Sequence, residues 1–183
     1  ERNYHIFYQL LKGCTQEFRL RSGLLPPDQY GYLIQSGCYE IEGVDDASDF
    51  REVMDAMNTL QFSTDLQTQM LQIIAGILWT GNITFTNGKS DGSSQVNQAS
   101  SAATEKACEL FGFQIDSFKY ALTEKRVQMG RGSVVSIKLN PAQAMDSKDT
   151  LAKALYSNMF DWVITKVNST LKTTESPFSI GIL

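Results

Sequence analysis

Apolar side chains recur at helical spacing through most of this chain, and this periodicity constrains the fold more than any other sequence feature. The clearest stripe comprises Leu66, Met70, Ile73, Ile74, Ile77 and Leu78. Ser63 precedes it as a suitable N-cap, and Gly81-Asn82 marks its end. A helix with one apolar face must pack against other elements, so the sequence predicts a mainly α, bundle-like fold.

The same spacing predicts helices on both sides of this stripe. Residues 4–11 form a short helix that we expect Gly13 to end as its C-cap. Asp45-Asp46 is placed to begin another, because a carboxylate satisfies free backbone N–H groups at the positive end of a helix. Asn140-Pro141 begins the longest helix, with proline at a tolerated first-turn position. Its apolar face comprises Leu151, Leu155, Met159, Trp162, Val163, Val167 and Leu171.

Shorter elements lie between these helices. Residues 102–111 and 115–125 are predicted as two short helices, and residues 15–44 as helical turns and loops around two prolines. Thr86 to Ser101 is mostly Asn, Gly, Ser, Gln and Ala, so we expect a flexible, exposed loop there.

Two segments favour β structure. Val134 to Ile137 is rich in β-branched residues and breaks the helical period, which predicts a small β-like loop. Phe178 to Leu183 has the composition of a buried C-terminal strand. Since the chain begins without Met and stops on this apolar run, we expect residues 1–183 to be a single segment of a larger protein.

Charge and composition exclude several functional classes. Sixteen basic against twenty acidic residues give a net charge of −4, which argues against a general nucleic-acid binder but permits a local basic patch. The cysteines, Cys14, Cys38 and Cys108, form no CxxC pair and favour reduced thiols. The longest apolar run, Ile73 to Trp79, is far shorter than the roughly 20 residues of a membrane span.

No catalytic or metal-binding pattern is present in the sequence. The chain carries no GxxxxGK(S/T) phosphate loop and no GxGxxG, HExxH or GxSxG motif. Its one histidine, His5, lies in an aromatic helix, where a structural role is favoured over a catalytic one. Asp45 with Asp46, and Asp49 with Glu52, are interpreted as helix-start and solvent-face charges. We therefore expect no catalytic residue and no metal ligand in this segment.

Four motifs along the chain resemble those of the myosin motor head. Glu1-Arg-Asn-Tyr-His-Ile-Phe-Tyr-Gln-Leu-Leu11 is similar to the family motif that follows the first nucleotide switch. Ala75 to Phe85 resembles the helix that ends in LGN-I-x-F, with Thr80 in place of the usual Leu or Ile. Asp149 to Trp162 resembles the DALAKALY…LFDW helix, with Thr150 in place of Ala. Ser179 to Leu183 resembles the strand that leads into the second switch.

This resemblance implies a specific place in a motor. Residues 1–183 would form the upper actin-binding (upper 50-kDa) subdomain, which forms one side of the actin-binding cleft and couples nucleotide state to actin affinity. The intact motor would bind ATP and Mg²⁺ outside this segment and carry a calmodulin-like light chain. Filamentous actin and the remaining motor subdomains would be its partners in the cytoplasm. The motifs are most like those of amoeboid and fungal class I heads, whose tails reach the cell cortex or membrane.

The resemblance also assigns a binding loop. Arg131-Gly132-Ser133-Val134-Val135-Ser136-Ile137-Lys138 is similar to an actin-binding loop of the head. Lys125, Arg126, Arg131 and Lys138 give this stretch four positive charges and no acidic residue, which suits the acidic surface of actin. From the residues alone, without the resemblance, a solvated hairpin with buried valines is the favoured interpretation.

Ser133 is the candidate regulatory residue. It lies sixteen residues before Asp149, where the resemblance implies an acidic or phosphorylatable residue. The basic residues around it suit a kinase of the p21-activated type, and a phosphate would add roughly −1.5 to −2 charge beside Arg131. The alternative is an ordinary exposed serine.

Two other functional classes remain open from the sequence. The chain could be a stand-alone helical module that binds a filament or scaffold without ATPase activity. It could also be a structural bundle with no binding face, in which case neutralising the basic residues of the loop would leave actin affinity unchanged.

Overall fold

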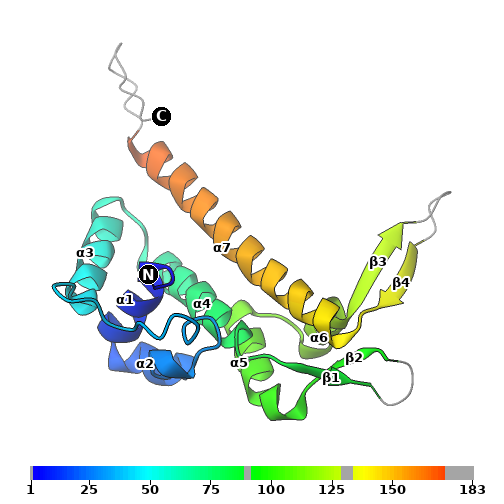
Figure 1. The fold of residues 1–183 in the computed structure, drawn as a ribbon. Coiled ribbons are helices and arrows are strands. Elements are labelled where there is room, and N and C mark those ends of the chain that lie inside the picture. The colour runs from blue at the N-terminus through cyan, green and yellow to red at the C-terminus, as the bar shows by residue number, and fades with distance from the viewer. Residues whose placement is uncertain (1, 89–91, 129–133, 172–183) are drawn as a thin grey trace.

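The computed structural model describes residues 2–88, 92–128 and 134–171 and has the predicted mainly α architecture. The first half contains α1 (His5–Gly13), α2 (Gln16–Ser22), the 3₁₀ turn η1 (Pro27–Gln29), α3 (Asp46–Thr59) and α4 (Thr64–Thr80). The second half contains β1 (Phe85–Asn87), β2 (Ser94–Val96), η2 (Gln98–Ser100), α5 (Ser101–Phe111), α6 (Ile115–Thr123), β3 (Glu124–Gln128), β4 (Val134–Lys138) and α7 (Pro141–Leu171). Helix α7 runs diagonally past the other helices, and both hairpins lie near its N-terminal end (Figure 1).

Side-chain caps fix most helix starts, as the sequence indicates. The Ser63 hydroxyl accepts a hydrogen bond from the Leu66 N–H, and the Asp45 carboxylate accepts from two N–H groups in the first turn of α3. At the start of α7, Asn140 and Gln143 exchange side-chain hydrogen bonds with each other's backbone N–H. This reciprocal pair is a capping box, and it explains why a helix of such length begins at Pro141.

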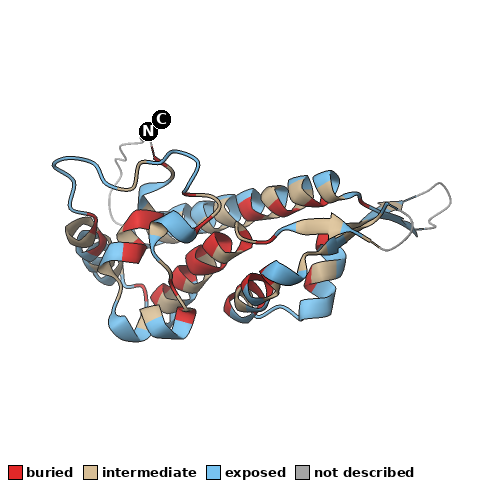
Figure 2. Ribbon diagram, turned by 60° about the horizontal axis from the view of Figure 1, so that its bottom comes forward, coloured by how far each residue is buried: buried red, intermediate tan, exposed pale blue. Residues whose placement is uncertain are grey.

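Two hydrophobic clusters form the core and meet at α4. The larger joins α1, α3 and α4, and the smaller joins α5 and α6 around the fully buried Ile83. The buried residues are most numerous in α4, which lies in the middle of the helical core (Figure 2). Trp79 and Phe111 contact both clusters, and α7 covers both, with Leu151 on the smaller and Leu155 on the larger. No helix in the described ranges is both long enough and apolar enough to cross a membrane.

Several boundaries differ from the prediction for identifiable reasons. Gly13 is the last residue of α1 and not a left-handed cap; a Cβ there would lie 2.5 Å from the Phe50 Cβ, so close packing with α3 requires glycine. Thr86 to Ser101 is not simply a loop, because β1 pairs antiparallel with β2 and the Ser100 side chain is buried. Helix α6 ends at Thr123, so Lys125 belongs to strand β3.

Two aromatic residues expected in the core lie outside it. Tyr4 is 58% exposed, although its ring stacks on Tyr156 of α7 with the centroids 4.2 Å apart. Trp162 is 42% exposed and packs edge-to-face with the ring of Phe62, because α7 extends beyond the helices that cover its first half. The predicted strand at 178–183 lies outside the described residues.

Asp46 begins α3, as predicted, and its side chain is also part of a buried ion pair. Its carboxylate accepts two hydrogen bonds from the Arg2 guanidinium, at 2.8 and 2.6 Å, and both side chains are almost fully buried. The guanidinium carbon also lies 4.4 Å from the centroid of the Tyr8 ring. This bidentate pair connects the segment before α1 to the first turn of α3.

We predict that Asp46→Ala destabilises this part of the fold by about 3–5 kcal/mol, because it leaves the Arg2 guanidinium buried without its carboxylate. The measurement is hydrogen exchange of the α1 and α3 amides in the protein that carries this chain. Glu40→Ala is the matched control, because it removes the exposed ion pair with Lys12 and should change little. Equal effects of the two substitutions would contradict the prediction.

Candidate functional site

The predicted binding loop is the β3–β4 hairpin, which follows α6 and precedes α7. Its strands are antiparallel and pair from Glu124 with Lys138 at the base to Gln128 with Val134 near the tip. Val134, Val135, Ser136, Ile137 and Lys138 form β4. Arg131, Gly132 and Ser133, which complete the predicted site, lie outside the described residues.

The apolar residues of β4 are exposed. Val134, Val135 and Ile137 have exposed fractions of 61, 45 and 49%. The interpretation of this segment as a hairpin with buried valines therefore does not describe β4. Exposed β-branched side chains at this density on one short strand are typical of a surface that another molecule covers.

Strand pairing sorts the hairpin residues onto two faces. Directly opposed residues project to the same side, so Lys125 and Ile137 share one face with Val127 and Val135. We call this set the outer face. The other set, the inner face, comprises Glu124, Arg126, Gln128, Val134, Ser136 and Lys138.

The inner face is attached to α6 by a polar cluster centred on Tyr120. The Tyr120 hydroxyl donates to Ser136 Oγ at 2.9 Å, and that hydroxyl in turn donates to the Glu124 carboxylate. The Arg126 guanidinium lies over the Tyr120 ring, 5.5 Å from its centroid. These contacts fix the orientation of the hairpin relative to α6.

The charge of the hairpin is less uniformly positive than the sequence stretch indicates. Lys125, Arg126 and Lys138 are all exposed, but Glu124 begins β3 and stands opposite Lys138. Sequence analysis assigned no role to Glu124 or Tyr120, because both fell within a helix predicted over 115–125.

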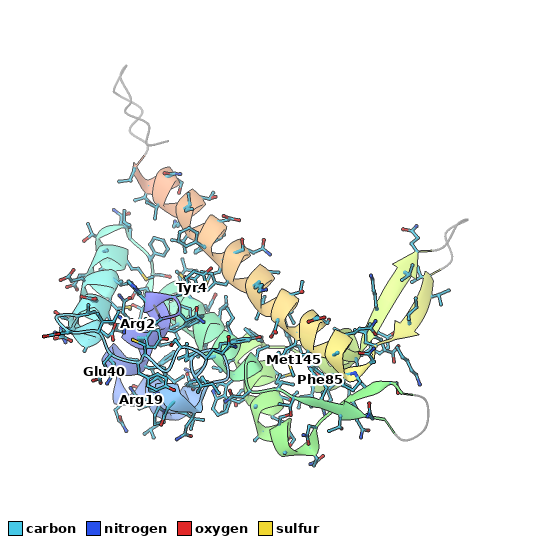
Figure 3. The ribbon with its side chains drawn as sticks, in the orientation of Figure 1. Arg2, Tyr4, Arg19, Glu40, Phe85 and Met145 are labelled. Carbon is cyan, nitrogen blue, oxygen red and sulfur yellow. The ribbon has the colours of Figure 1, made fainter. Side chains whose placement is uncertain are left out.

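The second hairpin, β1–β2, supports the base of the first. The Ser94 N–H donates to the Leu139 carbonyl at 2.7 Å, and the Leu139 N–H donates to the Thr123 carbonyl at 2.9 Å. The link between β4 and α7 is therefore hydrogen-bonded on both sides. Phe85, at the start of β1, lies close to this junction (Figure 3). Lys89 and Asp91, which lie between β1 and β2 in the sequence, are outside the described residues.

Three of the sequence motifs meet at Tyr32, which belongs to none of them. Its carbonyl accepts from Asn3 Nδ2 at 3.0 Å, and its hydroxyl donates to the Asp149 carboxylate at 2.7 Å. A Cβ on Gly81 would lie 2.8 Å from its ring, so the glycine of the second motif is required by this contact. Burial raises the pKa of Tyr32, and the hydrogen bond to Asp149 raises it further.

The same junction holds Asn82 of the second motif and Lys148, which precedes the third. Asn82 accepts from the Gly31 N–H at 2.7 Å and donates to the Gln29 carbonyl at 2.8 Å. Lys148 is buried beside Asp149, with its ammonium 3.2 Å from that carboxylate and 5.1 Å from the Tyr32 ring centroid. Tyr4 lies between α1 and α7 (Figure 3). Since these residues bind one another, the motifs hold α1, α4 and α7 together.

The described residues do not assemble a metal centre. Within 2–88, 92–128 and 134–171, no group of three or more His, Cys, Asp or Glu side chains could hold a metal ion. His5 is exposed in the first turn of α1 and does not take the packed structural position that we expected. Burial raises the pKa of the Cys14 and Cys108 thiols, which disfavours the reactive thiolate.

Comparison with known proteins agrees with the motifs along the whole chain. Residues 1–183 match the sequence profile of the family described as myosin head (motor domain). The chain is 37% identical to Myosin-1 of Mycosarcoma maydis and 38% identical to Myosin-1 of Vanderwaltozyma polyspora, and all of it aligns with 14 and 15% of those proteins. It is also 38% identical to the Myosin ID heavy chain of Dictyostelium discoideum, of which it spans 17%. The chain belongs to the myosin head family.

Proposed function

We propose that this chain is part of an actin-based, ATP-driven motor and lies between its first and second nucleotide switches. The observation that carries the proposal is the family match along residues 1–183, which includes every motif named above. In this proposal the segment is the upper actin-binding subdomain. It forms one side of the actin-binding cleft and couples nucleotide state to actin affinity.

ATP and Mg²⁺ are assigned to other parts of the head. The residues present do not fit a magnesium nucleotide, since no phosphate loop occurs in the sequence and, within the part of the chain that the structure describes, no three His, Cys, Asp or Glu side chains gather to hold a metal ion. The contribution of this segment is therefore mechanical. Helix α7 connects the Tyr32 junction to the hairpin. A displacement of the junction would therefore be transmitted through α7 to the hairpin.

Residues 131–138 are proposed to contact filamentous actin. Their support is the exposed hairpin with the cations Lys125, Arg126 and Lys138, which would attract an acidic filament surface. The fungal and amoeboid relatives support a class I-like motor, and its cortical location, light chain and tail contacts belong to the same proposal. The alternative of a stand-alone filament- or scaffold-binding module is not favoured by the match to a motor head.

Neutralising two cations of the loop should weaken actin binding in a salt-dependent way. For Lys125→Gln with Arg131→Gln in the intact head, we expect a Kd about 2- to 30-fold higher at low salt, because exposed ion pairs contribute about 0.2–1 kcal/mol each. The effect should shrink at higher salt. Actin cosedimentation at two ionic strengths measures it.

The matched control is Arg51→Gln with Lys153→Gln, which removes the same charge from exposed positions on α3 and α7. If this pair weakens binding as much as the loop pair, net charge and not the hairpin determines actin affinity.

Phosphorylation of Ser133 by a p21-activated-type kinase is the proposed regulation. We expect Ser133→Ala to suppress actin activation of the ATPase and Ser133→Glu to preserve it, with basal ATPase unchanged in both. Ser157→Ala and Ser157→Glu, at an exposed position on α7, are the controls. Indistinguishable actin activation in the Ser133 variants would refute the switch and leave the family assignment intact.

A further inference from the structure

A groove of about 600 Å³ lies between α2, α3 and the first half of α4. Thr15 caps α2 directly after α1, and Gly13 lets the end of α1 approach Phe50 of α3 closely. Helices therefore enclose the groove on three sides. Its volume lies within the range of roughly 300–1,000 Å³ that is usual for small-molecule sites.

The floor of this groove is apolar. Phe50 and Leu71 are buried, and Phe18 and Met54 are half-buried beside them. Aromatic rings and a thioether offer flat, polarisable surfaces that pack well against another ring. The floor therefore favours an aromatic ligand.

One polar group opens into the groove. Gln67 of α4 is 5% exposed, and its Nε2 donates to Asn58 Oδ1 at 2.8 Å and to the Phe62 carbonyl at 2.9 Å. Because a carbonyl can only accept, Phe62 fixes the side on which the amide nitrogen lies. Among the described residues, no hydrogen bond reaches Gln67 Oε1, and this oxygen is not one of the side-chain atoms sealed from solvent without a partner. It therefore faces the groove as an open acceptor.

The entrance of the groove carries charges of both signs. On α2 these are Glu17 and Arg21, and on α3 they are Arg51 and Asp55. All four side chains are exposed, and each helix contributes one cation and one anion. Because these charges cancel, the entrance has no net charge that would select an ionic ligand.

We propose that the groove binds a small, uncharged aromatic molecule that carries an N–H or O–H donor. The ring lies against the apolar floor, and the donor binds Gln67 Oε1. A half-enclosed acceptor favours a ligand that supplies its missing hydrogen bond over one of the same shape that cannot. The groove lies at the opposite end of the segment from the β3–β4 hairpin (Figure 1), so this inference does not rest on the proposed actin contact.

Cys14 lines the groove and can report its occupancy. The probes are 2-phenylindole, which has one N–H donor, and 1-methyl-2-phenylindole, which has none. In the intact head, alkylation of Cys14 by iodoacetamide is followed by mass spectrometry at increasing probe concentration. The reaction is run at alkaline pH, because burial raises the pKa of this thiol. Cys38, a half-buried thiol outside the groove, is the internal control.

We expect 2-phenylindole at ten times its Kd to slow the alkylation of Cys14 about tenfold, by simple occupancy of the site. The rate at Cys38 should not change. The methylated probe should bind with a Kd about 2- to 10-fold higher, because it cannot donate to Gln67 Oε1.

A variant that fills the groove tests the location independently. Thr68→Phe places a ring in the space between α3 and α4 and should raise the Kd of 2-phenylindole at least about tenfold in equilibrium dialysis. Thr165→Phe is the matched control, since both threonines donate to the carbonyl four residues earlier at 2.9 Å and Thr165 lies outside the groove. Its Kd should stay within about twofold of the unaltered head.

Several results would overturn the proposal. Slowing of neither thiol, or equal slowing of Cys14 and Cys38, would show that the probe does not occupy the groove. Equal Kd values for the two probes would remove the role of Gln67 and the ligand class with it. A Cys14 that iodoacetamide cannot reach in the intact head would show that another part of the head covers the groove. If Thr68→Phe lowers the stability of the head, the two probes on the unaltered head still decide.

Discussion

Helix α4 is apolar on nearly every side between Met70 and Thr80, and it can be kept from water only if other elements surround it. Helix α1 covers one side, α5 another and α7 a third. Gly76 permits the closest of these approaches, because a Cβ there would overlap the Phe111 ring. The arrangement of the remaining helices therefore follows from the need to cover one helix.

Helix α7 meets this requirement with only its first half. Ala144, Lys148 and Ala152 are buried, whereas Phe160, Trp162 and Ile164 are exposed farther along the same helix. The buried half is also the half that connects the hairpin to Tyr32, through Asp149. Attachment to α1 and α4 at this point determines where the N-terminal end of α7, and the hairpin before it, can lie.

Helices and caps that depend on neighbouring residues could be predicted from the sequence. The stripe of α4, the caps at Ser63 and Asp45, and the start of α7 at Pro141 each depend on residues within one or two turns. Partners that are distant in sequence gave no such signal. Arg2 and Asp46 are 44 residues apart, and their pairing is fixed by the packing of α1 on α3. The sequence could not show which residues α7 would leave exposed, since an apolar stripe looks the same whether or not a neighbour is long enough to cover it.

The candidate site was predictable to a similar extent. The β-branched run at 134–137 indicated a strand and its basic surroundings indicated an acidic partner, but the two faces emerged only from the register with β3. That register separates the hairpin into a polar face attached to α6 and an apolar face beside Lys125.

A phosphate at Ser133 would act on the charge of this site and leave its hydrophobic component unchanged. Because the two components respond differently to ions, a phosphorylated and an unphosphorylated hairpin would differ most at low salt and converge as salt rises. Under the proposed function, phosphorylation of such a site would adjust the rate of encounter with a filament.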